Sequence, residues 1–500
     1  MSVKQYAVNW SKRHVVKSIL LFFVHFLILV LIEALLLTWN DLGHLGSHMA
    51  ARGADYMYAL FSTLMLVVIM YLYFLFENKA MIANGKNIAL IFLLLDLSFV
   101  FSWLMGGINI YARPVAFLAL MAYVLIGRRS SIFMSIISAL LIFVADTFSG
   151  GESLGNAAYS SLIISFSAAM FAIFLCGKAR TRLDVVYVGI AIVVPIDITV
   201  FLLGTSTLVD VTMSNVQAFR DIALHMGYGL FGGVVSAVLF LALLPLFEVI
   251  FNCLTVYRLR ELTSSDARIL KKLKEEAPGT YNHSMVVAQL AEASAAAIGE
   301  DVDYARAAAL YHDVGKLHYP EHFTENQGDY NLHDELTPEL SADIIRSHAK
   351  DGYNLIKAHH LPDFLADIAI QHNGTLPIRY FYAKALKMTD GELNIEDFSY
   401  MGPKPQTKLA AIIMIADASE AAVRAVNAKK PEEAERAIRG IIEERMDLEQ
   451  FSECNITMVE LTKIRQALVN TLTGVYHHRV KYPTIRYKRT ESGKTKGENI

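Results

Sequence analysis

The chain has 500 residues, of which 54% are hydrophobic and 19% are charged, and its formal net charge at pH 7 is −3. This apolar composition excludes an ordinary soluble protein, and the small negative charge gives no sign of a DNA partner. Because single cores rarely grow beyond about 250–300 residues, the length predicts two or more domains.

Long apolar runs occupy the first half of the chain. A bilayer core of about 30 Å needs about 20 mostly apolar residues per helix. We therefore predict eight spans, at about 15–38, 54–76, 87–105, 112–127, 131–148, 157–176, 184–206 and 222–252. The first run is longer than the roughly 7–15 apolar residues of a cleaved signal peptide, so we expect a retained helix. The fourth and fifth runs are short and should form a tight hairpin.

Basic residues in the short loops orient this predicted bundle. Lys and Arg concentrate in cytoplasmic loops of membrane proteins. With the N-terminus inside, the inner loops hold Lys79, Lys86, Arg128, Arg129, Lys178, Arg180 and Arg182, whereas the outer loops hold only Arg52 and Arg220. The even number of spans and the charge bias both predict a multi-pass protein of the cell inner membrane with cytoplasmic N- and C-termini.

A few ionisable residues fall inside the predicted spans: Glu33, Asp96, Asp146, Asp197, His225 and Glu248. Because charged groups are costly in a bilayer, each is a candidate functional residue. The alternative is that each lies near a span end or faces a polar bundle interior. A transporter is a further interpretation, but discontinuous helices and inverted repeats would be expected for it, and neither is clear in the sequence.

The second half of the chain changes to soluble amphipathic helices without strand alternation, so the fold class is predicted to be all-α. We expect helices at about 281–298, 303–314, 338–349, 351–359, 362–371, 407–428, 431–447 and 456–479. The predicted organisation is an N-terminal helix and outer loop (1–53), a seven-helix bundle (54–253), a connecting amphipathic helix (254–277), a catalytic domain (278–485) and a basic disordered tail (486–500).

Histidine and aspartate residues recur where a metal cluster would need them. His283 lies in the first turn of its predicted helix, His348 at the end of another, and Asp417 within an apolar one; the others are the pair His312-Asp313 and His372. Buried imidazoles and carboxylates are costly unless they are paired or bound to metal. This mixed donor set suits manganese, iron or zinc better than magnesium or calcium. Two metals bridged by a carboxylate are a standard means of hydrolysing a phosphodiester.

The ordered string of ligands resembles the HD hydrolase superfamily. Further sequence motifs of the chain are similar to those of the seven-transmembrane receptors with an intracellular HD hydrolase, and the similarity covers about residues 55–480. It is carried by EAPGTYNHS (276–284), HDVGKL (312–317), ENQ (325–327), LTPELSADIIRSHAKDG (336–352), QHNGT (371–375), GPKPQTK (402–408) and IADASEAAVRA (415–425). The PgpH-like members of that family hydrolyse cyclic di-AMP to the linear dinucleotide, and the resemblance implies this activity here.

The resemblance also implies a role for each ligand. His283, His312, Asp313 and Asp417 would hold one metal, and Asp313 would bridge to a second metal that is completed by His348 and His372. The metals would be iron or manganese. Lys316 would lie near them and favour the substrate phosphate or the leaving oxygen; the alternative is a solvated lysine at a helix end.

Two departures from the family pattern affect these expectations. Asn373 stands where members commonly have a second histidine, which puts the second metal in doubt, although an amide oxygen or a held water could contact it. Residues 39–53 stand where members commonly carry a large extracellular domain. The alternatives left open are a membrane receptor or scaffold whose HD domain binds nucleotide with little turnover, and an HD nucleotidase. A homodimer is also conceivable.

Three residues are candidate substrate contacts: Thr375, Lys404 and Arg424. Lys404 lies in a rigid loop between two prolines, which could equally be a helix-capping turn. Arg424 could instead form a surface ion pair with Glu420, four residues earlier on the same helix.

Overall fold

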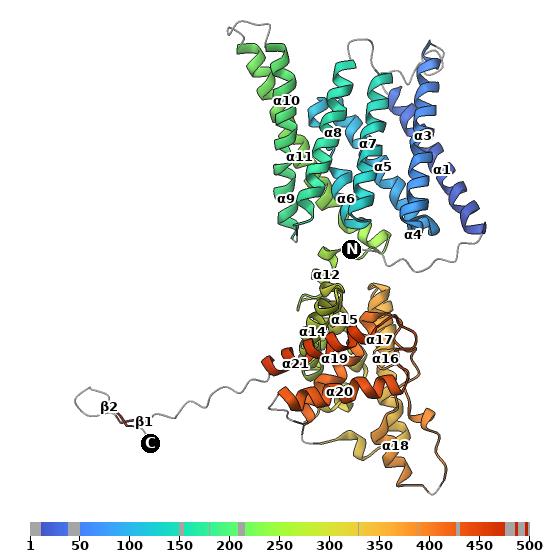
Figure 1. The fold of residues 1–500 in the computed structure, drawn as a ribbon, viewed down its shortest axis with the longest axis vertical. Coiled ribbons are helices and arrows are strands. Elements are labelled where there is room, and N and C mark those ends of the chain that lie inside the picture. Colours follow the sequence, from blue (N-terminus) through green and yellow to red (C-terminus); the bar gives the residue numbers. More distant parts are fainter. Residues whose placement is uncertain are drawn as a thin grey trace. The chain divides into compact units, whose positions relative to one another are not determined.

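The computed structural model divides the chain into two compact units, residues 1–258 and 259–500. It describes residues 12–38, 51–149, 155–179, 181–208, 216–328, 330–389, 391–426, 431–475, 486–488 and 496–498. Each unit is a bundle of helices (Figure 1).

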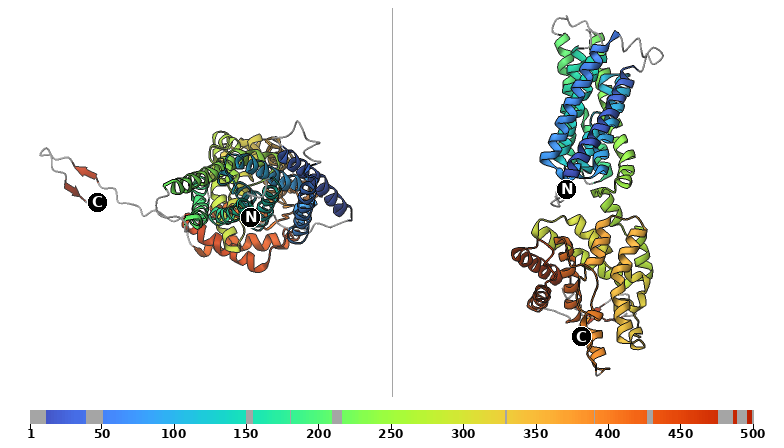
Figure 2. Two further views of the ribbon diagram at one scale, coloured as in Figure 1. Left: turned by 90° about the horizontal axis from the view of Figure 1, so that it is seen from above. Right: turned by 90° about the vertical axis from the view of Figure 1, so that its right-hand side faces the viewer.

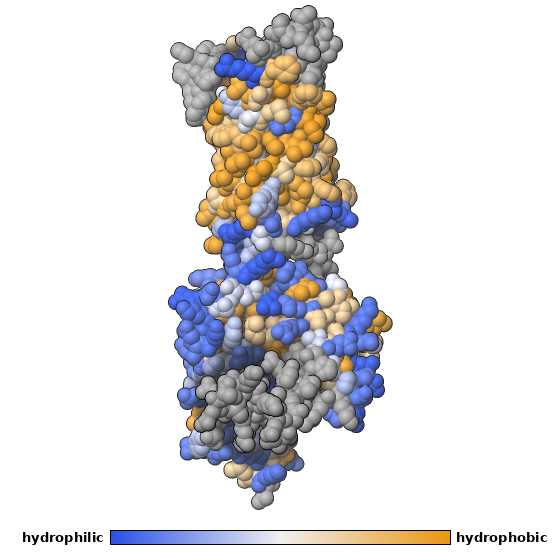
Figure 3. All heavy atoms as spheres, turned by 90° about the vertical axis from the view of Figure 1, so that its left-hand side faces the viewer, coloured by the Kyte–Doolittle hydropathy of each residue, from blue (hydrophilic) through white to orange (hydrophobic). Residues whose placement is uncertain are grey.

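The N-terminal unit consists of apolar helices that run roughly side by side (Figures 1 and 2). They are α1 (Lys12–Leu37), α3 (Gly53–Glu77), α4 (Lys79–Ala83), α5 (Gly85–Gly106), η2 (Ile110–Ala112), α6 (Phe117–Leu125), α7 (Arg128–Ser149), α8 (Gly155–Cys176), α9 (Arg182–Ala191), α10 (Val193–Leu208) and α11 (Val216–Ile250). Their outer surface is strongly apolar (Figure 3), with Phe61, Phe76 and Phe166 among the exposed side chains. Water disfavours such a surface and lipid does not, so this is a membrane protein.

Seven helical spans of this unit are long and apolar enough to cross a membrane, within the part of the chain that the structure describes, and one of them, Arg182–Leu202, combines α9 with part of α10. They match seven of our eight predicted spans. The predicted span at 112–127 is instead a short segment, Ile110–Leu125, made of η2 and α6. Pro114 separates the two helices, and every side chain from Phe117 to Ala122 is buried. Such interrupted backbone is tolerated at membrane depth where protein encloses it.

Ionisable side chains of this unit mostly find protein partners. Arg113 donates two hydrogen bonds to the carboxylate of Asp146, at 2.6 and 2.7 Å, and a third to Ser161 at 2.7 Å. A Cβ on Gly106 would lie 2.5 Å from the Arg113 Nε, so glycine leaves room for the guanidinium. Thr63 donates to Glu33 at 2.9 Å. For Asp146 and Glu33 the geometry therefore favours the polar-interior interpretation over a functional site.

The C-terminal unit is helical apart from one small ladder. Helix α12 (Val256–Leu262) includes the boundary between the two units along the chain. The helices that follow it are α13 (Arg268–Glu276), α14 (Pro278–Ile298), α15 (Val302–Tyr311), η4 (Val314–His318), η5 (Pro320–His322), η6 (Thr324–Asn326), η7 (Leu332–Asp334), α16 (Pro338–Ala358), α17 (Asp363–Gln371), α18 (Arg379–Leu386), η8 (Ile395–Phe398), α19 (Lys408–Ala425), α20 (Pro431–Asp447) and α21 (Met458–Val475). Strands β1 (Arg486–Lys488) and β2 (Lys496–Glu498) pair antiparallel within the basic tail, where the sequence predicted no regular structure.

Local sequence signals set several of the helix ends. Thr337 and Thr407 cap α16 and α19 by accepting backbone N–H groups of the first turn. Pro278 occupies the first position of α14, where a missing N–H costs nothing. Gly299 ends α14 in the left-handed conformation, with φ of 76°.

Three of our predicted boundaries were wrong. The predicted connecting helix is broken into α12 and α13, and the predicted pair 338–349 and 351–359 is the single helix α16. His348 therefore lies in the middle of a helix and not at its end. Because α14 begins at Pro278, His283 lies in its second turn.

A shallow groove lies behind η4 in this unit. It has a volume of about 330 Å³ and is bordered by α13, η4 and α16, with Lys272, Leu317 and Asn354 among its lining residues. The apolar face of α13, formed by Ile269, Leu270 and Leu273, is buried. Helix α13 packs against both α14 and η4.

Candidate metal centre

The six predicted metal ligands converge on one point, although they come from five separate parts of the unit. His283 lies on α14, His348 on α16 and Asp417 on α19; His312 and Asp313 follow α15, and His372 follows α17. His283 and all the others except Asp417 are at most 6% exposed, whereas the Asp417 side chain is 23% exposed. The centre therefore opens to solvent on the Asp417 side.

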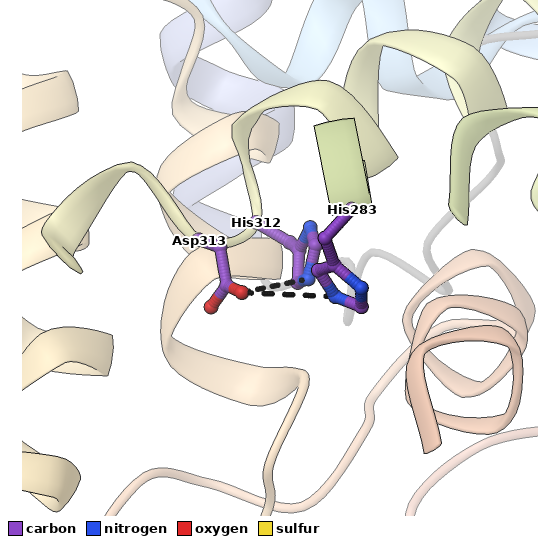
Figure 4. Close-up of side chains that lie close together, drawn as sticks. All are labelled: His283, His312 and Asp313. Atoms are coloured by element: carbon purple, nitrogen blue, oxygen red, sulfur yellow. Dashed lines mark ion pairs between the residues drawn. The ribbon is translucent and has the colours of Figure 1, made fainter. Parts of the chain in front are cut away.

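The carboxylate of Asp313 faces two pairs of histidines. Its Oδ2 lies 3.3 Å from Nε2 of His312 and 3.9 Å from Nε2 of His283 (Figure 4). Its Oδ1 lies 3.4 Å from Nε2 of His348 and 3.6 Å from Nε2 of His372. One oxygen thus serves each half of the centre, which is the arrangement that a carboxylate bridging two metals requires.

Asp417 completes the half formed by His283 and His312. Its Oδ1 lies 2.9 Å from Nε2 of His283 and 3.9 Å from Nε2 of His312. Three overlapping groups of these six residues each place their ligand atoms within 4.8 Å of one another.

The Nε2 atoms of three buried imidazoles converge on one space, and one of them has no hydrogen-bond partner among the described residues. His312 Nε2 is buried and has no hydrogen-bond partner. The Nε2 atoms of His348 and His372 face each other at 3.2 Å. Each of these three histidines has its Nδ1 against a backbone carbonyl, which can only accept, so in the neutral ring Nε2 carries no proton. In this neutral tautomer the converging Nε2 atoms fit a divalent transition metal.

Electrostatic effects divide the ligands into two groups. Burial would lower the pKa of His283 and His312, but the nearby carboxylates of Asp313, Asp417 and Glu420 raise these pKa values to about 9 and about 10. Burial lowers the pKa of His372 to about 3. Burial would raise the pKa of Asp313, but Lys316 and His312 hold it well below its usual range. Asp313 is therefore ionised and available to bind cations.

Lys316 contacts the bridging carboxylate directly. Its Nζ lies 2.8 Å from Asp313 Oδ2 and 2.7 Å from Glu325 Oε1, and its side chain is only 13% exposed. Thr280 also donates to Glu325, at 3.0 Å. A Cβ on Gly279 would lie 1.9 Å from the Glu325 carbonyl oxygen, so glycine permits this close approach. This geometry contradicts the alternative of a solvated lysine. It also shows that the ENQ segment supplies Glu325 as a partner for Lys316 of the HDVGK segment.

Comparisons with known proteins agree with this geometry. The family model for a 7TM receptor with intracellular HD hydrolase matches residues 54–255, and the HD domain model matches residues 280–422. The chain belongs to this family. HD domains are metal-dependent, and the His/Asp cluster described above can hold metal.

Curated relatives of the family share much of this sequence. The cyclic-di-AMP phosphodiesterase PgpH of Listeria monocytogenes is 40% identical over 377 residues, which are 74% of this chain and 50% of the relative. That of Bacillus subtilis is 36% identical over 418 residues, 83% of this chain and 57% of the relative. The chain therefore spans about half the length of the curated relatives it matches. The crystal structure of the L. monocytogenes PgpH HD domain in complex with cyclic-di-AMP is 49% identical, covers 43% of this chain and 99% of that chain, and has a TM-score of 0.41.

Asn373 lies at the second half of this HD centre. Its Nδ2 lies 2.6 Å from Nε2 of His372 and 3.1 Å from Nε2 of His348. The amide thus occupies the position from which a third side chain would contact a metal held by these two histidines. Exchanging the amide nitrogen and oxygen by a 180° rotation would place the acceptor there instead.

The three candidate substrate contacts already have protein partners. Thr375 exchanges hydrogen bonds with Gln450, at 3.0 Å in each direction. Lys404 donates to Ser452 at 3.3 Å. Arg424 is 51% exposed and lies 3.6 Å from Glu420, the partner given in its alternative, although the Glu420 side chain is buried and not at the surface. A substrate role for these residues stays a prediction.

Sequence reasoning missed four side chains of this site. Glu325 neutralises Lys316, and Glu420 contacts His283. The Tyr400 ring lies 5.8 Å from the His348 ring. Arg445 is 13% exposed and close enough to Asp417 for their charges to interact. The segment ENQ, which the resemblance already marked, was the one signal that could have identified Glu325.

Proposed function

We propose that this chain hydrolyses cyclic di-AMP to the linear dinucleotide at a two-metal centre formed by its HD domain. The observation that carries the proposal is the position of Asp313, whose two oxygens face separate pairs of histidines. The names of the relatives that share both domains supply the substrate. The donor set of imidazole and carboxylate suits manganese, iron or zinc, and the resemblance to the family favours iron or manganese among these.

Residues of this chain would bind the two metals and fix the bridging carboxylate. His283, His312 and Asp417 would bind one metal, His348 and His372 the other, and Asp313 both. Bound metals would neutralise phosphate charge and lower the pKa of water for attack on phosphorus. Lys316 keeps Asp313 ionised and fixed, and Arg445 is a cation close enough to Asp417 for their charges to interact. Attack of one water breaks one P–O3′ bond and leaves a 5′-phosphate and a 3′-hydroxyl.

The proposal includes a location for the protein. Basic residues of the predicted inner loops support cytoplasmic termini and insertion in the inner membrane, with the HD domain on the side where a cytoplasmic second messenger is found. A homodimer stays a prediction.

Hydrolysis by the detergent-solubilised chain tests this function. We expect manganese- or iron-loaded protein to convert cyclic di-AMP to a linear product, and we expect His312→Ala/Asp313→Ala to lose both metal and turnover. A panel of deoxynucleoside triphosphates separates a nucleotidase from a phosphodiesterase. Turnover retained by the double variant would refute the assigned centre, and nucleotide binding without any turnover by the wild type would favour the receptor alternative.

A further inference from the structure

The four histidines of the centre are oriented in two different ways. His312, His348 and His372 each donate Nδ1–H to the carbonyl of the residue three positions earlier, at 2.6, 2.5 and 2.8 Å. His283 instead has Nδ1 at 2.8 Å from the carboxylate oxygen Oε2 of Glu420. Among the described residues, His283 is therefore the one histidine of the centre whose Nδ1 meets a charged acceptor.

The Glu420 side chain that makes this contact is buried in the protein interior. It is 2% exposed, and its other oxygen lies 3.6 Å from Nη1 of the half-exposed Arg424. Glu420 and Asp417 are three residues apart on α19, which places them on one face of the helix. The imidazole of His283 is consequently held between two carboxylates, with Asp417 at Nε2 and Glu420 at Nδ1.

The contact between Glu420 and His283 should strengthen metal binding by the Nε2 atom of His283. A carboxylate that accepts the Nδ1–H of a ligating histidine fixes the ring and its tautomer and makes Nε2 a stronger donor to metal. A backbone carbonyl is neutral and supplies less of this effect. In the other half of the centre, His348 and His372 have only carbonyl acceptors at Nδ1, and Asn373 offers an amide where an imidazole would bind better.

We propose that Glu420 is a positioning residue that makes the metal position of His283, His312, Asp313 and Asp417 the tighter of two unequal positions. The proposal rests on the two-metal function given above. Arg424 supports it by contacting the second oxygen of Glu420 at 3.6 Å, which gives this half-exposed arginine a structural role at the centre.

Manganese binding by the full-length protein in detergent, after metal removal by EDTA, tests the proposal. We compare wild type, Glu420→Gln, Glu420→Ala and Glu443→Gln, an exposed glutamate that undergoes the same charge change. Loss of such an outer partner typically weakens metal affinity about 10–100-fold. We expect that loss in the tighter Kd of Glu420→Gln and a larger one in Glu420→Ala. The weaker Kd should stay within about twofold of wild type.

Two further readouts separate positioning from folding. Pulsed electron paramagnetic resonance of Mn²⁺ at the tighter position should show weaker coupling to imidazole nitrogen in Glu420→Ala. The thermal unfolding midpoint in EDTA should be the same for Glu420→Gln and Glu443→Gln. If Glu420→Ala does not fold, Glu420→Gln and Arg424→Gln still test the proposal, because both keep the packing of the helix.

Several outcomes would overturn the proposal. One is a tighter Kd that stays within twofold of wild type in both Glu420 variants; another is an equal loss at both positions. An equal loss in Glu443→Gln would show that the effect is not specific to this site. If the wild type binds Mn²⁺ at two unequal positions but does not hydrolyse cyclic di-AMP, the proposed function fails while the assignment of Glu420 stands.

Discussion

Replacing Gly315 by alanine should disable the centre although no metal ligand is replaced. Gly315 lies in η4, between Asp313 and Lys316 on one side and α16 on the other. A Cβ at this position would lie 1.9 Å from the His348 carbonyl oxygen and 2.4 Å from the Gly352 nitrogen, whereas real Cβ atoms essentially never approach below 3.0 Å. Because both obstacles are backbone atoms, η4 and α16 must separate by at least about 1.1 Å.

This separation acts on the bridging geometry. Asp313 Oδ1 would move away from His348, which it faces at 3.4 Å. A misplacement of about 1 Å in a reacting centre can cost roughly 10²-fold in rate. We therefore expect Gly315→Ala to lower turnover of cyclic di-AMP about 100-fold and to lower the content of the second metal, measured by product chromatography and elemental analysis of the same sample.

Gly440→Ala is the matched control for this experiment. Gly440 lies in α20, and a Cβ added there would have nothing within 4 Å, so the same substitution meets open space. Alanine in a helix interior is favoured over glycine by about 0.5–1 kcal/mol, so this variant should keep full activity and unfold at the same or a slightly higher temperature. A Gly315→Ala protein with at least half of wild-type turnover and two metals would refute the reasoning.

Three other perturbations test separate contacts. Lys316→Met removes the cation shared by Asp313 and Glu325, whose side chains are 3% and 13% exposed, so it should lower the free energy of unfolding in EDTA by about 3–5 kcal/mol. Lys316→Met/Glu325→Gln should recover part of the loss, and equal stabilities in denaturant titrations would contradict this. Asn373→His should tighten the weaker Mn²⁺ Kd at least about tenfold, because imidazole binds such metals better than an amide does; an unchanged Kd by titration would count against the position assigned to this residue. The hydrogen bond from Lys408 holds the pKa of Glu460 below its ordinary value of 4.5, so its stabilisation is complete above that pH and is lost as pH falls through the folded-state pKa. Glu460→Gln should therefore lower the unfolding temperature at pH 7 but not at pH 3, and a difference that persists at pH 3 would exclude this ion pair as the cause.

The ligand set could be predicted from the sequence because histidine and aspartate residues recur at or within successive predicted helices, and their order along the chain resembles that of HD hydrolases. His312-Asp313 and Asp417 each follow an apolar helical stretch, and folding such helices around one core brings their ends together. The sequence could not distinguish a buried glutamate from a solvated one, so Glu325 and Glu420 were missed. Their burial depends on tertiary contacts with Lys316 and His283.

Two errors in the predicted helices arose because local sequence does not show how helices pack against one another. The helix that carries His348 was predicted to end at residue 349, but it continues to Ala358, and Gly352 within it lies close to Gly315 of η4. The segment at 112–127 was predicted to span because of its composition alone. Composition does not show that a run is enclosed by neighbouring helices, as α6 is.

The packing of α13 ties the metal ligands to a helix that carries none of them. Helix α13 begins at Arg268, 18 residues after α11 ends at Ile250, and it packs against η4, the turn that contains Lys316. The turn η4 begins at Val314, directly after Asp313, so α13 is separated from this ligand by one short turn. Substitutions on the buried face of α13 should therefore alter the centre without replacing a ligand.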